Sequence, residues 1–174
     1  SSNITSSETW AAADNPHIVT TSIHVYNSAT LTIEPGCLVK FDAATALYIG
    51  YYSAATLIAE GTSSKPITFT SHATTPAPGD WEGIVFFNST DDASTVMKYC
   101  TVEYGGYTSY DSNINCNQAS PTIQHCIIRN SDGHGIYTTG SGALPLISCS
   151  TITNNVNGVY AYNNSNPTLT DCRI

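Results

Sequence analysis

Apolar and polar residues alternate in short segments along almost the whole chain, and Gly, Pro, Asn and Asp interrupt these segments. An alternation with a period of two is typical of β-strands that bury one face. Only residues 7–13 (SETWAAA) have helical propensity, and this stretch is too short to form a stable helix. The pattern therefore predicts an all-β protein.

Three segments repeat one pattern of apolar positions: PTIQHCIIRN (121–130), PLISCSTITN (145–154) and PTLTDCRI (167–174). Each reads Pro-x-aliphatic-x-x-small-x-Ile, and residues 95–102 align with them without a gap. The alignment predicts three inward-facing columns, which are Met97, Ile123, Ile147 and Leu169; Cys100, Cys126, Ser150 and Cys172; and Val102, Ile128, Ile152 and Ile174. Within each column the residues recur every 22 to 26 positions.

A second strand recurs between these segments, as GIVF (83–86), NINC (113–116), GIYT (135–138) and GVYA (158–161). Its inward columns are Ile84, Ile114, Ile136 and Val159, followed by Phe86, Cys116, Thr138 and Ala161. A period in the low twenties with two or three short strands per repeat predicts a solenoid, because one repeat cannot bury its apolar face alone. Stacking roughly six or seven rungs at ~4.8 Å would give a rod about 30 Å long.

The first half of the chain fits this repeat less regularly. Residues 29–41, 47–62 and 65–71 alternate as strands, and we expect them to be the first three rungs. We expect residues 26–174 to form the solenoid, which ends in the middle of a rung. Residues 1–25 are expected to be an N-terminal lead-in or cap.

Four phrases carry a resemblance to a known family: TLTIEPGCLVKF, LIAEGTSSKPITFTS, GDWEGIVF and MKYCTVEYGG. They resemble the right-handed parallel β-helix domains of large bacterial and archaeal surface proteins, which share the fold of the pectate lyases. The resemblance covers residues ~17–174. It implies a single-stranded right-handed parallel β-helix of about 22–28 residues per rung, most members being surface modules. That family usually has an aliphatic residue where Cys37 stands, which makes Cys37 a further core residue.

The charge of the chain excludes two classes of partner. With a formal net charge of −8 and only five Lys and Arg residues, the chain lacks the basic surface that binding to nucleic acids or anionic membranes requires. No apolar run approaches the ~20 residues of a membrane span, so we expect no membrane insertion. Hydroxyl and amide side chains replace charged ones, which is common in secreted proteins, and Asn3, Asn88 and Asn163 are candidate N-glycosylation sites.

The six cysteines include no Cys-x-x-Cys pair, so zinc-ribbon spacing is absent. Cys100, Cys126 and Cys172 share an inward column, and we predict that they pack there as small apolar residues. A Cys100–Cys126 disulfide is the alternative, because these residues lie on adjacent rungs. The position just before this column holds Tyr99, His125, Cys149 and Asp171. We place this position at a bend, where the residue type is only loosely constrained. We favour this interpretation over catalysis or metal binding by these four residues.

Acidic residues are candidates both as metal ligands and as catalysts. The loop with Asp91 and Asp92 is a candidate calcium site, and no other cofactor is expected. Lyase chemistry needs a base beside calcium-binding acids, and a glycosidase needs two carboxylates ~5–10 Å apart in a groove. Glu103 and Arg129 lie on adjacent rungs, where a surface ion pair of small energetic value is the simplest interpretation.

Outward-facing tyrosines are the best candidates for a binding site. Tyr137 and Tyr160 share a column, Tyr162 lies two residues further on, and Tyr107 lies in the longest loop of the second half. Tyrosine rings among hydroxyl and amide groups suit stacking on sugars and hydrogen bonding to them. The alternative is a ladder of rings that stabilises adjacent strands.

These features predict a non-catalytic extracellular or cell-surface module with a structural or adhesive role, for which contact with glycans is a further candidate property. Its partners would be the rest of a longer surface protein or a polysaccharide. One alternative is a filament subunit that stacks head-to-tail on copies of itself through open ends. The other is a polysaccharide lyase or hydrolase.

Overall fold

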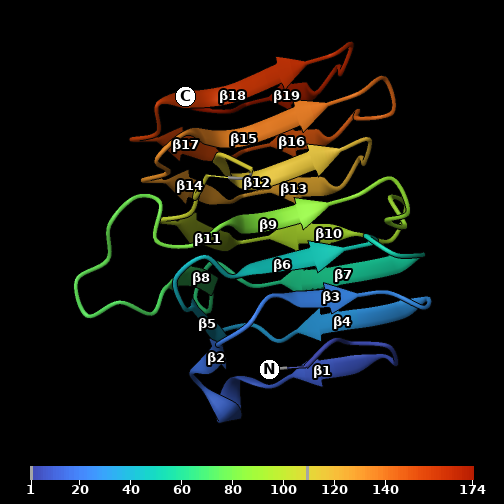
Figure 1. The fold of residues 1–174 in the computed structure, drawn as a ribbon. Helices are drawn as coiled ribbons and strands as arrows, with labels where there is room; N and C mark the ends of the chain where they lie inside the picture. Colours follow the sequence, from blue (N-terminus) through green and yellow to red (C-terminus); the bar gives the residue numbers. More distant parts are fainter. Residues whose placement is uncertain (1, 109) are drawn as a thin grey trace.

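The strands of this protein lie in three parallel sheets that wind into a right-handed parallel β-helix (Figure 1). The computed structural model describes residues 2–108 and 110–174. Sheet B contains β1 (Glu8–Trp10), β4 (Ala29–Ile33), β7 (Ala55–Glu60), β10 (Val96–Lys98), β13 (Thr122–Gln124), β16 (Leu146–Ser148) and β19 (Thr168–Thr170). Sheet C contains β2 (His17–Val19), β5 (Leu38–Phe41), β8 (Ile67–Ser71), β11 (Cys100–Glu103), β14 (Ile127–Arg129) and β17 (Thr151–Thr153).

Sheet A completes the coil with β3 (Ile23–Val25), β6 (Ala46–Ile49), β9 (Gly83–Phe86), β12 (Ser112–Asn117), β15 (His134–Thr139) and β18 (Asn157–Tyr162). A 3₁₀ turn, η1 (Ala12–Asp14), lies between β1 and β2. Each rung takes one strand from sheet B, then one from sheet C, then one from sheet A. In the described part of the chain this order repeats six times and begins a seventh time at β19, which confirms the predicted six to seven rungs.

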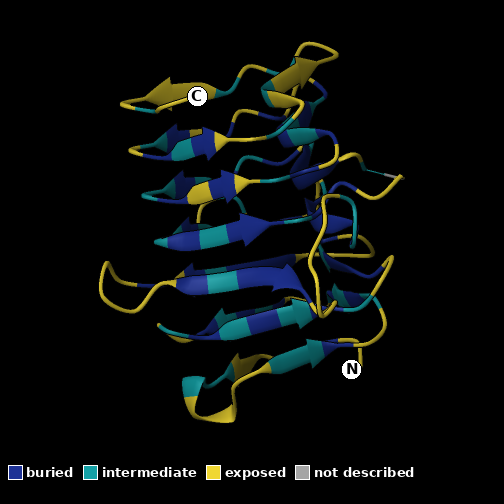
Figure 2. Cartoon of the chain, turned by 90° about the vertical axis from the view of Figure 1, so that its left-hand side faces the viewer, coloured by how far each residue is buried: buried dark blue, intermediate teal, exposed yellow. Residues whose placement is uncertain are grey.

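The inward columns predicted from the repeat are confirmed by the strand register. Met97 pairs with Ile123, Ile123 with Ile147, and Ile147 with Leu169. The columns of the second strand pair in the same way, from Ile84 to Val159 and from Phe86 to Ala161. Strands in the middle of the stack are mostly buried, whereas those of the last rung are largely exposed (Figure 2).

The prediction for the N-terminal segment needs correction, because residues 8–25 form a complete rung. β1, β2 and β3 pair in parallel with β4, β5 and β6. Among the described residues, 2–7 come before this rung, and there Ile4 is 3% exposed and bridges to Val25. The predicted rung boundaries also shift, since residues 29–41 hold two strands of one rung. Strands of three residues are too short for alternation to separate them from a lead-in.

From β10 onwards, a single residue in each rung makes the bend between sheet B and sheet C, whereas the first three rungs use longer connections. Tyr99, His125, Cys149 and Asp171 all have a positive φ, between 48° and 53°. This left-handed conformation turns the chain sharply between two strands without a loop. The predicted bend at this position is confirmed. The rings of Tyr99 and His125 stack outside it, 4.7 Å apart.

The cysteine column next to this bend does more than fill space. The Cys100 thiol donates to the Lys98 carbonyl at 3.4 Å, and the Cys126 thiol donates to the Gln124 carbonyl at 3.3 Å. Ser150 occupies the same column, and its hydroxyl donates to the Ser148 carbonyl at 2.8 Å. In these rungs the column therefore holds a small side chain that donates a hydrogen bond to the carbonyl before the bend, whereas Ile67 occupies the column one rung before Cys100.

The Cys100–Cys126 disulfide, which was the alternative to packing, is not formed. All six cysteines are free thiols, and Cys149 is the exposed one among them. Burial raises the pKa of the Cys100 thiol and that of the Cys116 thiol. Buried thiols with a raised pKa are poor nucleophiles, because the thiolate is the reactive form.

Thiol labelling tests this assignment. We expect all six cysteines to react with a thiol reagent in the unfolded, unreduced protein, and one to react rapidly in the folded protein. Cys149→Ser should remove the rapid phase, whereas Cys116→Ser should leave it unchanged. Recovery of only four thiols after unfolding without reductant would contradict the free-thiol assignment.

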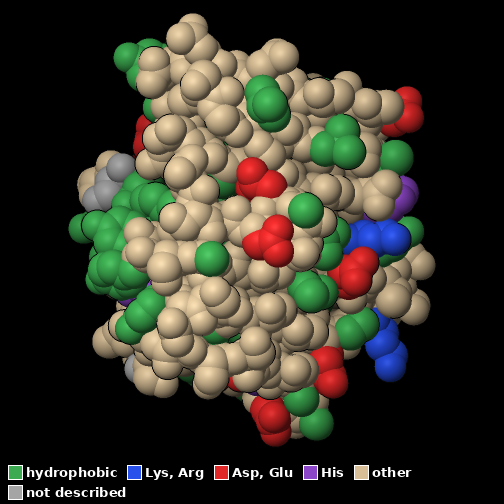
Figure 3. Space-filling model, turned by 90° about the vertical axis from the view of Figure 1, so that its right-hand side faces the viewer, with side chains coloured by type: hydrophobic (Ala, Val, Ile, Leu, Met, Phe, Trp, Pro, Cys, Tyr) green, Lys and Arg blue, Asp and Glu red, His purple; other side chains and the backbone are tan. Residues whose placement is uncertain are grey.

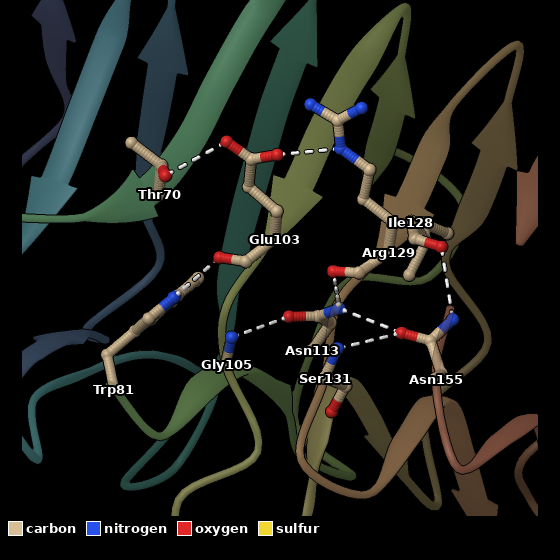
Figure 4. Close-up of polar contacts among 9 residues, drawn as sticks. All are labelled: Thr70, Trp81, Glu103, Gly105, Asn113, Ile128, Arg129, Ser131 and Asn155. Atoms are coloured by element: carbon tan, nitrogen blue, oxygen red, sulfur yellow. Dashed lines mark hydrogen bonds and ion pairs between the residues drawn. The ribbon is translucent and has the colours of Figure 1, made fainter. Parts of the chain in front are cut away.

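The bend between sheets C and A is built from buried polar side chains (Figure 4). The Asn113 amide donates to the Arg129 carbonyl at 2.8 Å and accepts from the Gly105 backbone N–H at 2.8 Å. Two rungs further on, the half-buried Asn155 amide accepts from the Ser131 backbone at 2.9 Å and donates to the Ile128 carbonyl. These amides replace the backbone hydrogen bonds that the bend removes.

The predicted surface ion pair between Glu103 and Arg129 is more buried than expected. Arg129 Nε lies 2.7 Å from Glu103 Oε2, and the Glu103 side chain is only 11% exposed. The hydroxyl of Thr70 donates to the other carboxylate oxygen at 3.0 Å (Figure 4). The carboxylate is therefore held by two rungs at once, from β8 and from β14.

Residues 72–82 form a long connection from β8 to β9 that projects from the rod (Figure 1). It returns to the core at Trp81, which is completely buried and stacks on Phe41 with ring centroids 4.0 Å apart. The Trp81 indole N–H donates to the Glu103 carbonyl at 2.9 Å. These contacts end the loop before β9 begins, so the loop does not displace the register.

Two neighbouring residues of β16 offer a matched test of the core. Ile147 is fully buried, whereas Leu146 is 46% exposed on the opposite face. Ile147→Ala should lower the free energy of unfolding by about 2–5 kcal/mol, because it leaves a cavity in the column. Leu146→Ala should change it by less than about 0.5 kcal/mol. Urea unfolding of both variants measures this, and equal losses would contradict the assignment of the two faces.

Candidate functional site

The outer face of sheet A carries an unusual number of aromatic side chains. Because strands alternate, each strand of this sheet presents one residue of a common outward row. The register gives this row as His24, Tyr48, Val85, Asn115, Tyr137 and Tyr160. Aromatic rings occupy both ends of the row, and Val85 and Asn115 separate them.

We call the rings at the N-terminal end the lower aromatic cluster; its members are His24, Tyr26, Tyr48, Tyr51, Tyr52, Phe87 and Tyr110. The centroid of His24 lies 4.6 Å from that of Tyr48 and 4.9 Å from that of Tyr52. Tyr51 and Tyr52 are 50% and 60% exposed, so the cluster reaches the solvent. In the space-filling view, hydrophobic side chains gather along the left-hand edge of the molecule (Figure 3).

We call the rings at the other end the upper aromatic row; its members are His134, Tyr137, Tyr160 and Tyr162. Tyr137 and Tyr160 pair across β15 and β18, and their rings stack with centroids 5.7 Å apart. His134 stacks on Tyr160 at 4.6 Å, and Tyr162 extends the row at 6.5 Å. The structure therefore brings together three of the four predicted tyrosines.

Tyr107, the fourth predicted tyrosine, lies outside this row. It is 41% exposed in the loop before β12, and its backbone N–H donates to the Trp81 carbonyl. Its ring takes part in none of the aromatic contacts found among the described residues. Tyr110 of the same loop instead reaches sheet A, where its ring centroid lies 5.8 Å from that of Tyr48.

A groove of about 300 Å³ separates the two aromatic groups. Its lining residues are Tyr110, Asp111, Asn115, Asn117, His134, Tyr137 and Thr139. Tyr110 and Tyr137 form its aromatic sides, and the remaining residues are polar. Asn115 is 3% exposed, and its Oδ1 is buried with no hydrogen-bond partner among the described residues. We call this feature the sheet A groove.

Hydrogen bonds orient His134 at the edge of the sheet A groove. The Asn157 amide lies 3.1 Å from His134 Nδ1, and this places the ring proton on Nε2 if the amide nitrogen donates. His134 Nε2 lies 3.8 Å from Asp111 Oδ2, which is beyond hydrogen-bonding distance. The Asp111 side chain is 58% exposed, so its carboxylate remains available to a ligand.

Acidic side chains, and none of the Lys and Arg residues, lie near the sheet A face. Burial raises the pKa of Tyr48 to about 12, and the nearby Tyr110 and Glu82 add to the shift. Burial also raises the pKa of Tyr110. All five Lys and Arg residues lie elsewhere, in sheets B and C or in the segments that join them: Lys40, Lys65, Lys98, Arg129 and Arg173.

The predicted calcium and glycosylation sites lie away from the sheet A groove. Asp92 Oδ1 accepts a hydrogen bond from the Ser120 backbone at 2.7 Å, and burial raises the pKa of this carboxyl. Among the described residues no three His, Cys, Asp or Glu side chains gather to hold a metal ion, so calcium at Asp91 and Asp92 stays a prediction. Asn3, Asn88 and Asn163 are all exposed, and their modification likewise stays a prediction.

The fold and the comparisons together define the class of this protein, a parallel β-helix domain. A family model described as a pectate-lyase-like beta helix domain matches residues 2–113, and the chain belongs to this family. No curated protein and no solved structure matches the chain. Across the described residues, no helix has the length and apolar character needed to span a membrane.

The raised pKa of Tyr48 predicts how stability depends on pH. The folded protein retains the Tyr48 proton up to about pH 12, whereas the unfolded chain releases it near pH 10. The stabilisation is therefore complete below pH 10 and is lost as the pH rises through 12. In Tyr48→Phe, urea unfolding should show a shallower loss of stability over this range. Tyr52→Phe serves as the exposed control, and identical pH slopes for Tyr48→Phe and wild type would contradict the prediction.

Proposed function

We propose that this chain is a non-catalytic module of an extracellular or cell-surface protein, and that it binds glycans on the outer face of sheet A. The observation that carries the proposal is the polar sheet A groove between the lower aromatic cluster and the stacked rings of the upper aromatic row. Aromatic rings flanking hydroxyl, amide and carboxylate groups match the alternating apolar and polar faces of sugars. A rigid strand scaffold holds these groups in place without a ligand.

The composition supports the extracellular part of the proposal. Charged residues make up 10% of the chain, and hydroxyl and amide side chains take their place on the surface. The parallel β-helix supplies a stiff rod, because each rung hydrogen-bonds to its neighbours along the whole stack. A rod with a binding face along one side suits a structural or adhesive role at a cell surface.

An enzymatic role is the main competing function. It requires paired carboxylates or a base beside calcium-binding acids, and Asp111 is the one carboxylate that lines the sheet A groove. Incubation with a panel of polysaccharides, with and without calcium, separates the two functions. We expect binding without formation of shorter or unsaturated products. Turnover that Asp111→Asn abolishes would replace the proposal with an enzyme.

Removal of the stacked rings tests the binding face. The double variant Tyr137→Ala, Tyr160→Ala should weaken the binding of any glycan found on an array by about tenfold or more, because two stacking surfaces are lost. Tyr107→Ala is the matched control, since Tyr107 and Tyr160 are 41% and 42% exposed. Circular dichroism should confirm that all variants fold. Unchanged glycan affinity in a folded double variant would leave the rings with the structural role of a ladder.

A further inference from the structure

The charge and hydrogen-bonding groups of the sheet A groove define its ligand more narrowly. Resting on the proposed function, we infer that the sheet A groove binds an oligosaccharide with free amino groups, whose ammonium group lies between Asp111 and Asn115. In this arrangement a sugar ring stacks on Tyr137. The inference excludes uronic acid oligomers as ligands of the groove.

The sheet A groove holds a buried hydrogen-bond acceptor that has no donor among the described residues. Asn115 is only 3% exposed, yet its Oδ1 lacks a hydrogen-bond partner among the described residues. The Asn115 amide nitrogen already faces the Tyr110 carbonyl at 3.5 Å. A buried acceptor without a donor costs about 1–3 kcal/mol, and a ligand that supplies an N–H or O–H recovers this cost. The groove therefore favours a ligand that donates hydrogen bonds.

The Asp111 carboxylate gives the sheet A groove its charge. The Asp111 carboxylate is an acceptor only, and the single ring facing it, His134, lies too far away for a hydrogen bond. All five Lys and Arg residues lie away from sheet A. In the space-filling view, basic side chains lie toward the right-hand edge of the molecule, opposite the edge where hydrophobic side chains gather (Figure 3). A carboxylated sugar would meet like charge here, whereas an ammonium group has three donors and the opposite charge.

The backbone conformation of Asp111 fixes this residue at the edge of the sheet A groove. Its φ is 46°, in the left-handed region that Asp and Asn tolerate better than most residues. Its backbone carbonyl accepts from the His134 N–H at 2.7 Å, which ties the loop before β12 to β15. The carboxylate is thus held at the mouth of the groove by the backbone. Asn at this position keeps the same backbone preference and removes the charge.

Calorimetric titration with three oligomers of equal length tests the inference. The probes are a glucosamine oligomer, an N-acetylglucosamine oligomer and a galacturonic acid oligomer. We expect the glucosamine oligomer to bind at least about tenfold more tightly than its acetylated form, and the galacturonic acid oligomer not to bind. Asp111→Asn should remove this preference while retaining weak binding of both glucosamine probes.

A charge-matched control is available next to the groove. Asp132→Asn removes the same charge from an exposed residue outside the groove lining, and it should keep the preference. Equal affinity for the two glucosamine probes, or tighter binding of the acetylated or uronic acid oligomer, would overturn the inference and leave the proposed function in place. If none of the probes nor any glycan on an array binds, the inference and the proposed function both fail.

Discussion

The left-handed residue between sheets B and C is the constraint on which the rest of this structure depends. From β10 onwards, one such residue per rung turns the chain between two strands without a loop, as at His125 and Cys149. The carbonyl before this residue accepts a backbone N–H from the preceding rung and also a hydrogen bond from the small side chain in the next inward position, as from Cys126 and Ser150. Because these rungs turn in the same way, residues of equal position stack directly, and the interior becomes a set of columns.

The same register forms the outer face of sheet A. Where successive rungs repeat an aromatic residue, as at Tyr137 and Tyr160, the rings stack. Where the repeat is broken by Val85 and Asn115, no ring fills the outward position, and Tyr110 covers part of the gap from its loop. The proposed binding face therefore arises from regular stacking together with one local departure from it.

The inward columns and the stacked pair of tyrosines could be predicted from the sequence, because both follow from spacing along the chain. The first rung could not, since β1, β2 and β3 are too short for a periodic pattern. The lower aromatic cluster was also missed, although Tyr48 with the Tyr51–Tyr52 pair was a visible signal. Two of these rings lie in a turn without a repeat. The approach of Tyr110 to Tyr48 is a tertiary contact that no local pattern encodes.

The connection of residues 72–82 lengthens one rung without changing the register of its strands. β8 pairs with β5 and β11, and β9 pairs with β6 and β12, so the strands on both sides keep their partners despite the long excursion. The stacked strands bear the structure, while the excursion is free to change in length and composition. Such a corner is where an evolving rod, or a designer, can graft a new surface without rebuilding the coil.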